Sequence, residues 1–169
     1  MTWRFFCVPN STLSIEKVLL PGDADFVGPA MPSKLSPQAY ASLRKQTPTQ
    51  SIRDMVNAGD GPFSDPVYGY SVNRLQADHI VPMKVITEVP NFNMLERAGQ
   101  VDVLNNPENF MGLGGPSNAS KGALMWSDWS GHSQLGPIPP GFKQQMIDRQ
   151  NQLLTILQQQ INNGVRNGM

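Results

Sequence analysis

Glycine and proline interrupt this chain so often that they limit what it can fold into. The 169 residues include 15 glycines and 15 prolines, and both residue types favour turns and break helices and strands. The stretch that follows the glycine- and proline-rich link at 136–141 is the main exception. Because 39% of the residues are apolar, the chain can still bury a core. We therefore expect an α+β fold of short elements that ends in one long helix.

The expected organisation is a single compact domain in three successive parts. Residues 1–60 form an irregular and partly helical N-terminal segment, with a strand at 15–20. Residues 61–135 form the core that carries the chemistry. Residues 136–169 contain a helix that packs on that core.

Capping residues predict where several elements begin and end. Ser36 followed by Pro37 is a typical N-cap and first helical residue, and Pro48 should end that helix. Ser117 is also a good N-cap, which places Asn118 in the first turn of the next helix. The other elements expected are helices at 51–58, 93–98, 118–129 and 142–162 and extended segments at 68–81 and 109–113.

The helix predicted at 142–162 is amphipathic. Its apolar residues mostly share one face, and glutamines occupy the opposite face. The apolar residues are Met146, Ile147, Leu153, Leu154, Leu157 and Ile161. We expect this face to pack on the core and the glutamines to face solvent. Trp126 and Trp129, which precede this helix, are expected to anchor the same core.

Charge and cysteine content exclude several classes of protein. Thirteen basic residues balance thirteen acidic ones, so net charge does not indicate nucleic acid, although a local basic groove remains compatible with it. The single Cys7 excludes a disulfide framework and a four-cysteine zinc site. No run of eighteen apolar residues exists, and the apolar run before Pro9 is too short for a secretory signal.

The stretch with the most chemical information is Gln76-Ala-Asp78-His79-Ile-Val-Pro82. Asn109 lies in a predicted strand further along, and Asn118 follows nine residues later. Lys121 comes three residues after Asn118. The order is therefore a strand ending in Asp-His, a loop, a strand with Asn, a tight turn, and a helix with Asn and Lys.

This layout resembles the ββα-metal finger of the HNH, or His-Me finger, endonucleases. The resemblance covers Leu75 to about Trp129, near a third of the chain, and the Asp-His-Ile-Val-Pro string is its most specific part. It is especially similar to the HNH domain of the RNA-guided CRISPR nucleases, in which the last member is also Asn. Two features depart from the family: the loop from His79 to Asn109 is longer, and the CxxC pairs that hold a structural zinc are absent.

The resemblance implies a role for each residue of the motif. His79 would be the general base, since imidazole titrates near neutrality. Asp78 and Asn118 would hold one divalent ion, Mg²⁺ or Mn²⁺, through hard oxygen ligands. Asn109 would brace the loop after His79, and Lys121 would contact a phosphate at the helix start. Because adjacent strand residues point to opposite faces, one shared centre would require the backbone to curl at Asp78-His79.

Each assignment has a structural alternative. Asp78-His79 could be a hydrogen-bonded pair at a strand end, Asn118 a plain helix-start residue, and Lys121 a solvated lysine. Asn109 has close rivals in Asn105 and Asn106.

Three neighbouring side chains complete these expectations. His132 follows a predicted helix break at Gly131, so we expect an ordinary loop histidine. Arg74 and Lys84 flank the motif and could add phosphate contacts.

The resemblance predicts a metal-dependent endonuclease that hydrolyses DNA and leaves a 5′-phosphate and a 3′-hydroxyl. No zinc finger, helix-turn-helix signature or basic arm indicates sequence-specific binding. Stand-alone HNH domains resemble the warheads of delivered bacterial toxins, which implies action in the target-cell cytoplasm and a cognate immunity protein. The alternatives are a phage or restriction-defence HNH enzyme and a non-catalytic nucleic-acid-binding module.

Overall fold

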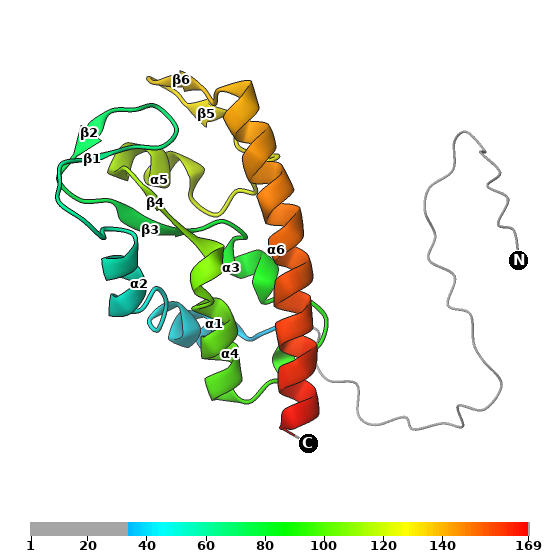
Figure 1. The fold of residues 1–169 in the computed structure, drawn as a ribbon. Helices are drawn as coiled ribbons and strands as arrows, with labels where there is room; N and C mark the ends of the chain where they lie inside the picture. The colour runs from blue at the N-terminus through cyan, green and yellow to red at the C-terminus, as the bar shows by residue number, and fades with distance from the viewer. Residues whose placement is uncertain (1–33, 169) are drawn as a thin grey trace, which may run out of the picture. The chain divides into compact units, whose positions relative to one another are not determined.

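A computed structural model describes residues 34–168 of the chain. The strand expected at 15–20 and most of the irregular N-terminal segment lie outside these residues. Figure 1 shows a small α+β unit in which short helices and two-stranded sheets lie beside one long helix, α6. The α+β class predicted from the sequence is therefore confirmed. No helix within residues 34–168 combines the length and the apolar character needed to cross a membrane.

Side-chain caps define the first two helices. Helix α1 (Pro37–Arg44) begins where the sequence predicted, because Ser36 Oγ accepts the N–H of Ala39. Helix α2 (Gln50–Met55) begins after Thr49, whose hydroxyl accepts the N–H of Ile52. It is shorter than the predicted 51–58 helix. The side chain of Asn57 bonds both the N–H and the C=O of Leu75, so the chain there is tied to a different segment.

Six short strands form three antiparallel pairs within the described residues. Strand β1 (Phe63–Ser64) pairs with β2 (Ser71–Val72), and β5 (Gly131–His132) pairs with β6 (Gly136–Pro137). The central pair is β3 (Gln76–His79) with β4 (Phe110–Leu113).

The register of the central pair sets Asp78 opposite Met111 and His79 opposite Phe110. The strand predicted at 109–113 is thus confirmed. The extended segment predicted at 68–81 is confirmed only for its strand residues.

The connection between β3 and β4 is itself structured. It contains α3 (Met83–Ile86), the 3₁₀ turn η1 (Phe92–Met94), α4 (Arg97–Leu104) and the 3₁₀ turn η2 (Pro107–Asn109). The helix predicted at 93–98 is wrong. Leu95 has extended dihedral angles and is 7% exposed, so the chain leaves the 3₁₀ turn there to bury this side chain before α4 begins.

Helix α5 (Gly115–Lys121) departs from the prediction of a helix at 118–129 capped by Ser117. It starts earlier because Asp65 Oδ2 accepts the N–H of Gly114 and the Tyr70 hydroxyl accepts the N–H of Ser117. These bonds satisfy N–H groups that a helix start leaves unpaired. It ends at Gly122, which has φ 51. Lys121 therefore lies in the last turn, not in the first.

Helix α6 (Pro140–Asn167) extends beyond the predicted 142–162 and packs against α4 (Figure 1). Most of its predicted apolar face is buried, as expected, including Met146, Leu153, Leu157 and Ile161. Gln150 is an exception to the polar face, because it lies on the buried side and is 2% exposed. Its Oε1 accepts the backbone N–H of Trp126 at 2.9 Å, which pairs a polar group that would otherwise be buried without a partner.

One hydrophobic core joins α6 to the rest of the unit. Trp126 and Trp129 are 0% and 1% exposed and lie in this core, so their predicted role as anchors is confirmed. Their ring centroids are 5.3 Å apart with an edge-to-face geometry, the arrangement that aromatic pairs prefer. This core positions α5 and the end of β3.

Candidate functional site

A cleft of about 440 Å³ brings together three of the five residues that the sequence singled out. Asp78, His79 and Asn118 line it, whereas Asn109 and Lys121 are fully buried and do not. The remaining lining residues are Tyr40, Arg44, Thr47, Pro48, Ala77, Pro82, Met83, Lys84, Gly122 and Ala123. The cleft therefore lies among α1, β3, α3 and α5.

The imidazole of His79 is held in one tautomer. Its Nε2 lies 2.9 Å from the carbonyl oxygen of Leu104 and 3.3 Å from the hydroxyl of Thr47. A carbonyl oxygen only accepts, so Nε2 carries the proton and donates it, which leaves a lone pair on Nδ1. Leu104 is the last residue of α4, where carbonyl groups have no partner within the helix. No pattern in the sequence indicated this contact, because it depends on where α4 ends.

The surroundings of His79 keep it neutral. Burial lowers the pKa of His79 to about 4, with smaller contributions in the same direction from the charges of Lys121 and Arg44. The bond to Leu104 opposes this shift, because it favours the protonated ring. The ring also packs on Phe110, with 4.2 Å between centroids. At neutral pH the imidazole is therefore uncharged and able to accept a proton at Nδ1.

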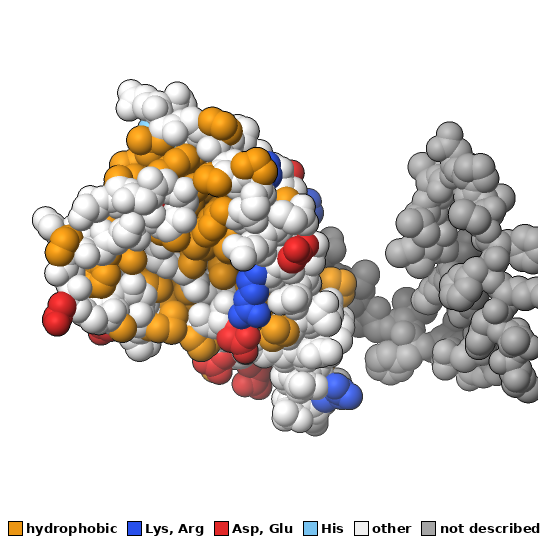
Figure 2. All heavy atoms as spheres, turned by 45° about the horizontal axis from the view of Figure 1, so that its top comes forward, with side chains coloured by type: hydrophobic (Ala, Val, Ile, Leu, Met, Phe, Trp, Pro, Cys, Tyr) orange, Lys and Arg blue, Asp and Glu red, His pale blue; other side chains and the backbone are white. Residues whose placement is uncertain are grey.

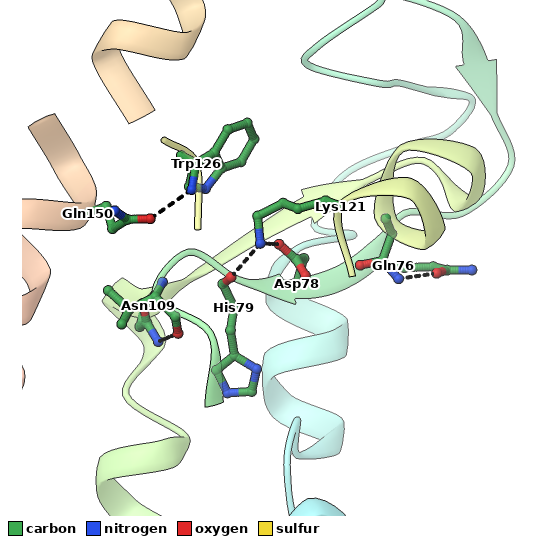
Figure 3. Close-up of polar contacts among 9 residues, drawn as sticks. Gln76, Asp78, His79, Asn109, Lys121, Trp126 and Gln150 are labelled. Carbon is green, nitrogen blue, oxygen red and sulfur yellow. Dashed lines mark hydrogen bonds and ion pairs between the residues drawn. The ribbon is translucent and has the colours of Figure 1, made fainter. Parts of the chain in front are cut away.

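Asp78 points away from His79. Figure 3 shows the carboxylate on one side of β3 and the imidazole on the other, as strand alternation requires. The backbone curl expected at Asp78-His79 does not occur, since β3 pairs regularly with β4 through His79. The two side chains thus reach the same cleft from opposite sides of one strand.

A buried ion pair fixes the carboxylate of Asp78. Its Oδ2 lies 2.8 Å from Nζ of Lys121, whose side chain is 0% exposed. Burial raises the pKa of Asp78, and the neighbouring Lys121 ammonium opposes that change. Lys121 also donates to the carbonyl oxygen of His79 at 3.1 Å and lies 5.5 Å from the ring centroid of Trp126 (Figure 3).

These contacts correct the prediction for Lys121. The side chain is neither solvated nor near a helix N-terminus, because α5 begins at Gly115 and Lys121 is in its last turn. Its ammonium binds Asp78 and the backbone of His79 where the sequence suggested a phosphate. No local pattern indicated this pairing, which depends on the frame of α5.

Asn109 makes the contacts that a bracing residue needs. Its Oδ1 accepts the N–H of Val81 at 2.8 Å and its Nδ2 donates to the carbonyl oxygen of Val81 at 3.1 Å. The rival residues bond elsewhere: Asn105 Nδ2 donates to Gln46 and Val101, and Asn106 Nδ2 donates to Gln160. Asn109 thus holds the loop directly after His79.

Asn118 lies partly exposed at the edge of the cleft. Its Nδ2 donates to Oε1 of Gln76 at 2.6 Å, and no described residue donates a hydrogen bond to its Oδ1. Asp78 and Asn118 therefore offer hard oxygen donors that suit Mg²⁺ or Mn²⁺, with water or phosphate as the remaining ligands. Lys121 occupies Oδ2 of Asp78, so Oδ1 is the atom left for a metal.

Two further observations concern the residues that could bind a metal ion. Within residues 34–168, no group of three or more His, Cys, Asp or Glu side chains is arranged to hold a metal ion. His132 lies outside the cleft lining, and its Nδ1 accepts the N–H groups of Gln134 and Leu135. The sequence predicted a loop histidine, whereas His132 is the last residue of strand β5.

Comparisons of this chain with protein-family models, with curated proteins and with solved structures found no match. The chemistry of the cleft itself is therefore the basis for assigning a function.

Proposed function

We propose that this chain is a metal-dependent endonuclease of the HNH type that hydrolyses phosphodiester bonds in DNA. The observation that carries the proposal is the state of His79. Its neutral imidazole presents a free Nδ1 in the same cleft as the oxygen atoms of Asp78 and Asn118. In this assignment β3, β4 and α5 are the two strands and the helix of the ββα-metal finger.

The proposed chemistry begins with a water molecule in the cleft. Nδ1 of His79 takes its proton as the oxygen attacks phosphorus and the 3′-oxygen departs. Leu104 and Thr47 hold the ring at Nε2, and the carbonyl end of α4 stabilises the positive charge that the ring gains. A divalent ion held by Asp78 and Asn118 would neutralise charge on the phosphate and on the leaving oxygen.

Two buried residues restrain the backbone that carries His79. Asn109 fixes Val81, and Lys121 binds the carbonyl oxygen of His79, so the backbone is restrained at His79 and directly after it. A catalytic base has to be held in position, whereas a decayed module has no such requirement. This favours an enzyme over the non-catalytic nucleic-acid-binding alternative.

The biological setting remains a proposal from the sequence resemblance. We propose a toxin or effector domain that acts on DNA in the cytoplasm of a target bacterium and is blocked by an immunity protein. Co-expression with the product of the adjacent gene tests this setting. Protection of the host by that product would support the toxin assignment over a phage or restriction-defence enzyme.

The experiment that tests the activity uses the full chain with supercoiled plasmid, in Mg²⁺ and in chelator. We expect nicking only with metal, and His79→Ala should lower the rate by about 10²-fold or more, the usual contribution of a general base. His132→Ala is the matched control and should cleave like the unmodified protein. Chelator-resistant cleavage, or a His79→Ala variant of normal rate, would exclude the mechanism. A parallel assay with RNA tests the choice of substrate.

A further inference from the structure

A second hollow extends the cleft along β3 toward α2. It has a volume of about 560 Å³ and shares Pro48, Ala77 and Asn118 with the cleft, so the two form one continuous depression. The other residues that line it are Gln50, Arg53, Arg74, Leu75 and Gln76. We call the cleft and this hollow together the basic groove.

The basic groove concentrates positive charge in a chain whose net charge is zero. Arg44 and Lys84 line it on the side of His79, and Arg53 and Arg74 line the extension. All four side chains are exposed. The one carboxylate in the lining belongs to Asp78, which already pairs with buried Lys121.

The four groove cations have no carboxylate partner within residues 34–168, where the two ion pairs are Lys121–Asp78 and Arg149–Glu108. Arg53 uses only its Nε, which donates to the carbonyl oxygen of Pro48. Figure 2 shows one face of the molecule, on which Lys and Arg side chains are few and scattered and the most prominent lies beside acidic side chains. The unpaired positive charge in the groove therefore requires a separate explanation.

We infer that the basic groove binds an extended stretch of a nucleic-acid strand on both sides of the phosphate that is cleaved. Arg53 and Arg74 contact backbone phosphates on one side, and Arg44 and Lys84 contact them on the other. Guanidinium groups suit this task because their N–H groups match two phosphate oxygens at once. This inference rests on the proposed function, and it adds which residues hold the phosphates on either side of the cleaved one.

The decisive comparison is between a polymeric and a minimal substrate. Bis(p-nitrophenyl) phosphate has one diester phosphate and no flanking ones, so its hydrolysis needs the site but not the extension. We expect the Arg53→Gln/Arg74→Gln variant to hydrolyse it at the normal rate in Mn²⁺. Cleavage of plasmid by the same variant should fall about tenfold or more at moderate salt.

Binding provides a readout that does not depend on turnover. In a His79→Ala background, affinity for a labelled duplex is measured across a salt series in Ca²⁺. Loss of two phosphate contacts should reduce the slope of log affinity against log salt by about 1.8, at ~0.9 for each contact. Arg97→Gln/Arg166→Gln is the matched control, because both residues are exposed cations outside the basic groove and should leave the slope unchanged.

The single variant Arg74→Gln is included in case the double variant misfolds. Arg74 makes no hydrogen bond or ion pair with a described residue, so its substitution should leave the fold intact. It should reduce the slope by about 0.9. If slope and plasmid cleavage are unchanged in both variants while the unmodified protein cleaves DNA, the inference is overturned and the proposed function stands. If hydrolysis of the small diester falls as much as plasmid cleavage, the arginines serve the site itself and the inference is likewise overturned. If the unmodified protein binds duplex with the expected slopes but cleaves nothing, the groove stands and the proposed function fails.

Discussion

The two faces of β3 show how one short strand can separate two kinds of polar chemistry. On one face, Asp78 pairs through Oδ2 with the ammonium of Lys121, whose side chain is closed to solvent. On the other face, the imidazole of His79 lines the cleft, is uncharged and is held at Nε2, and no described residue bonds its Nδ1. The charge of Asp78 is balanced by Lys121 on the first face, whereas His79 on the second face carries no charge because it is deprotonated. A buried ionisable group can therefore serve structure or reactivity, depending on which of these solutions surrounds it.

Removing the charge of Lys121 breaks its ion pair with Asp78 and should have the largest effect on stability. Lys121→Met leaves the Asp78 carboxylate buried without a partner, which typically costs about 3–5 kcal/mol of folding free energy. Urea denaturation measures this loss, with exposed Lys45→Met as the control. The Asp78→Asn/Lys121→Met double variant should recover much of the stability. A loss below about 1 kcal/mol in the single variant would show that the ion pair is not a stability determinant.

Lowering the pH should protonate His79 and so destabilise the second face of β3. The folded-state pKa of His79 lies at about 4, below its ordinary value of 6.5, so the unfolded chain binds the proton more readily. The stability that this pKa difference contributes is complete above pH 6.5 and is lost as pH falls toward 4, an effect of about 3 kcal/mol by linkage. Urea denaturation in chelator across this range measures it. His79→Gln should show a flatter profile there, and equal profiles would contradict the assignment.

Asn109→Ala should loosen the loop behind the second face. The N–H and the C=O of Val81 would both lose their partners inside the protein, at a cost of about 2 kcal/mol for buried groups left unpaired. Nuclease activity should fall by more than the folded fraction does, because this loop follows His79. Asn73→Ala, an exposed change in a turn, is the control. Normal specific activity in a destabilised Asn109→Ala protein would restrict Asn109 to a structural role.

Thr47→Val should have the smallest effect. The bond from Nε2 to Leu104 remains, so the tautomer of His79 is retained, while the Thr47 hydroxyl loses its contact with Nε2 and its own bond to the carbonyl oxygen of Leu104. We expect the cleavage rate to fall roughly three- to tenfold, equivalent to the ~0.5–1.5 kcal/mol of one hydrogen bond. The KM should not change. Thr155→Val on α6 serves as the control. An equal loss of cleavage rate in that variant would show that the effect is not specific to Thr47.

Elements with strong local signals could be predicted from the sequence. The Ser36 cap placed the start of α1 correctly, although the helix ends at Arg44 and not at Pro48, and the apolar periodicity of the last segment located α6 and most of its buried face. The same reasoning failed for α5. Gly115 and Pro116 were interpreted as a break, yet proline is tolerated in the first turn of a helix, and contacts from Asp65 and Tyr70 determine the actual start.

The candidate site was predictable in its members but not in its geometry. The motif spacing identified Asp78, His79 and Asn118, and all three line the cleft. The partners that define their chemistry come from distant segments: Leu104 orients His79, and Lys121 neutralises Asp78. Such pairings depend on where helices end and which way side chains point, neither of which one sequence specifies.

Gln150 gives α6 a fixed phase relative to the rest of the molecule. Its side chain bonds the backbone of Trp126, so only one rotational setting of the helix presents an acceptor at that position. A residue inserted or deleted between Phe142 and Gln150 would turn the following part of the helix by about 100° and bring a different side chain to Trp126. The helix still packs on the core through Val165, and Gly164 lies close to Leu95, so only length changes beyond the end of α6 at Asn167 carry no such constraint. Tags and fusion partners are therefore best attached at the C-terminal end of α6, where added length leaves its phase intact.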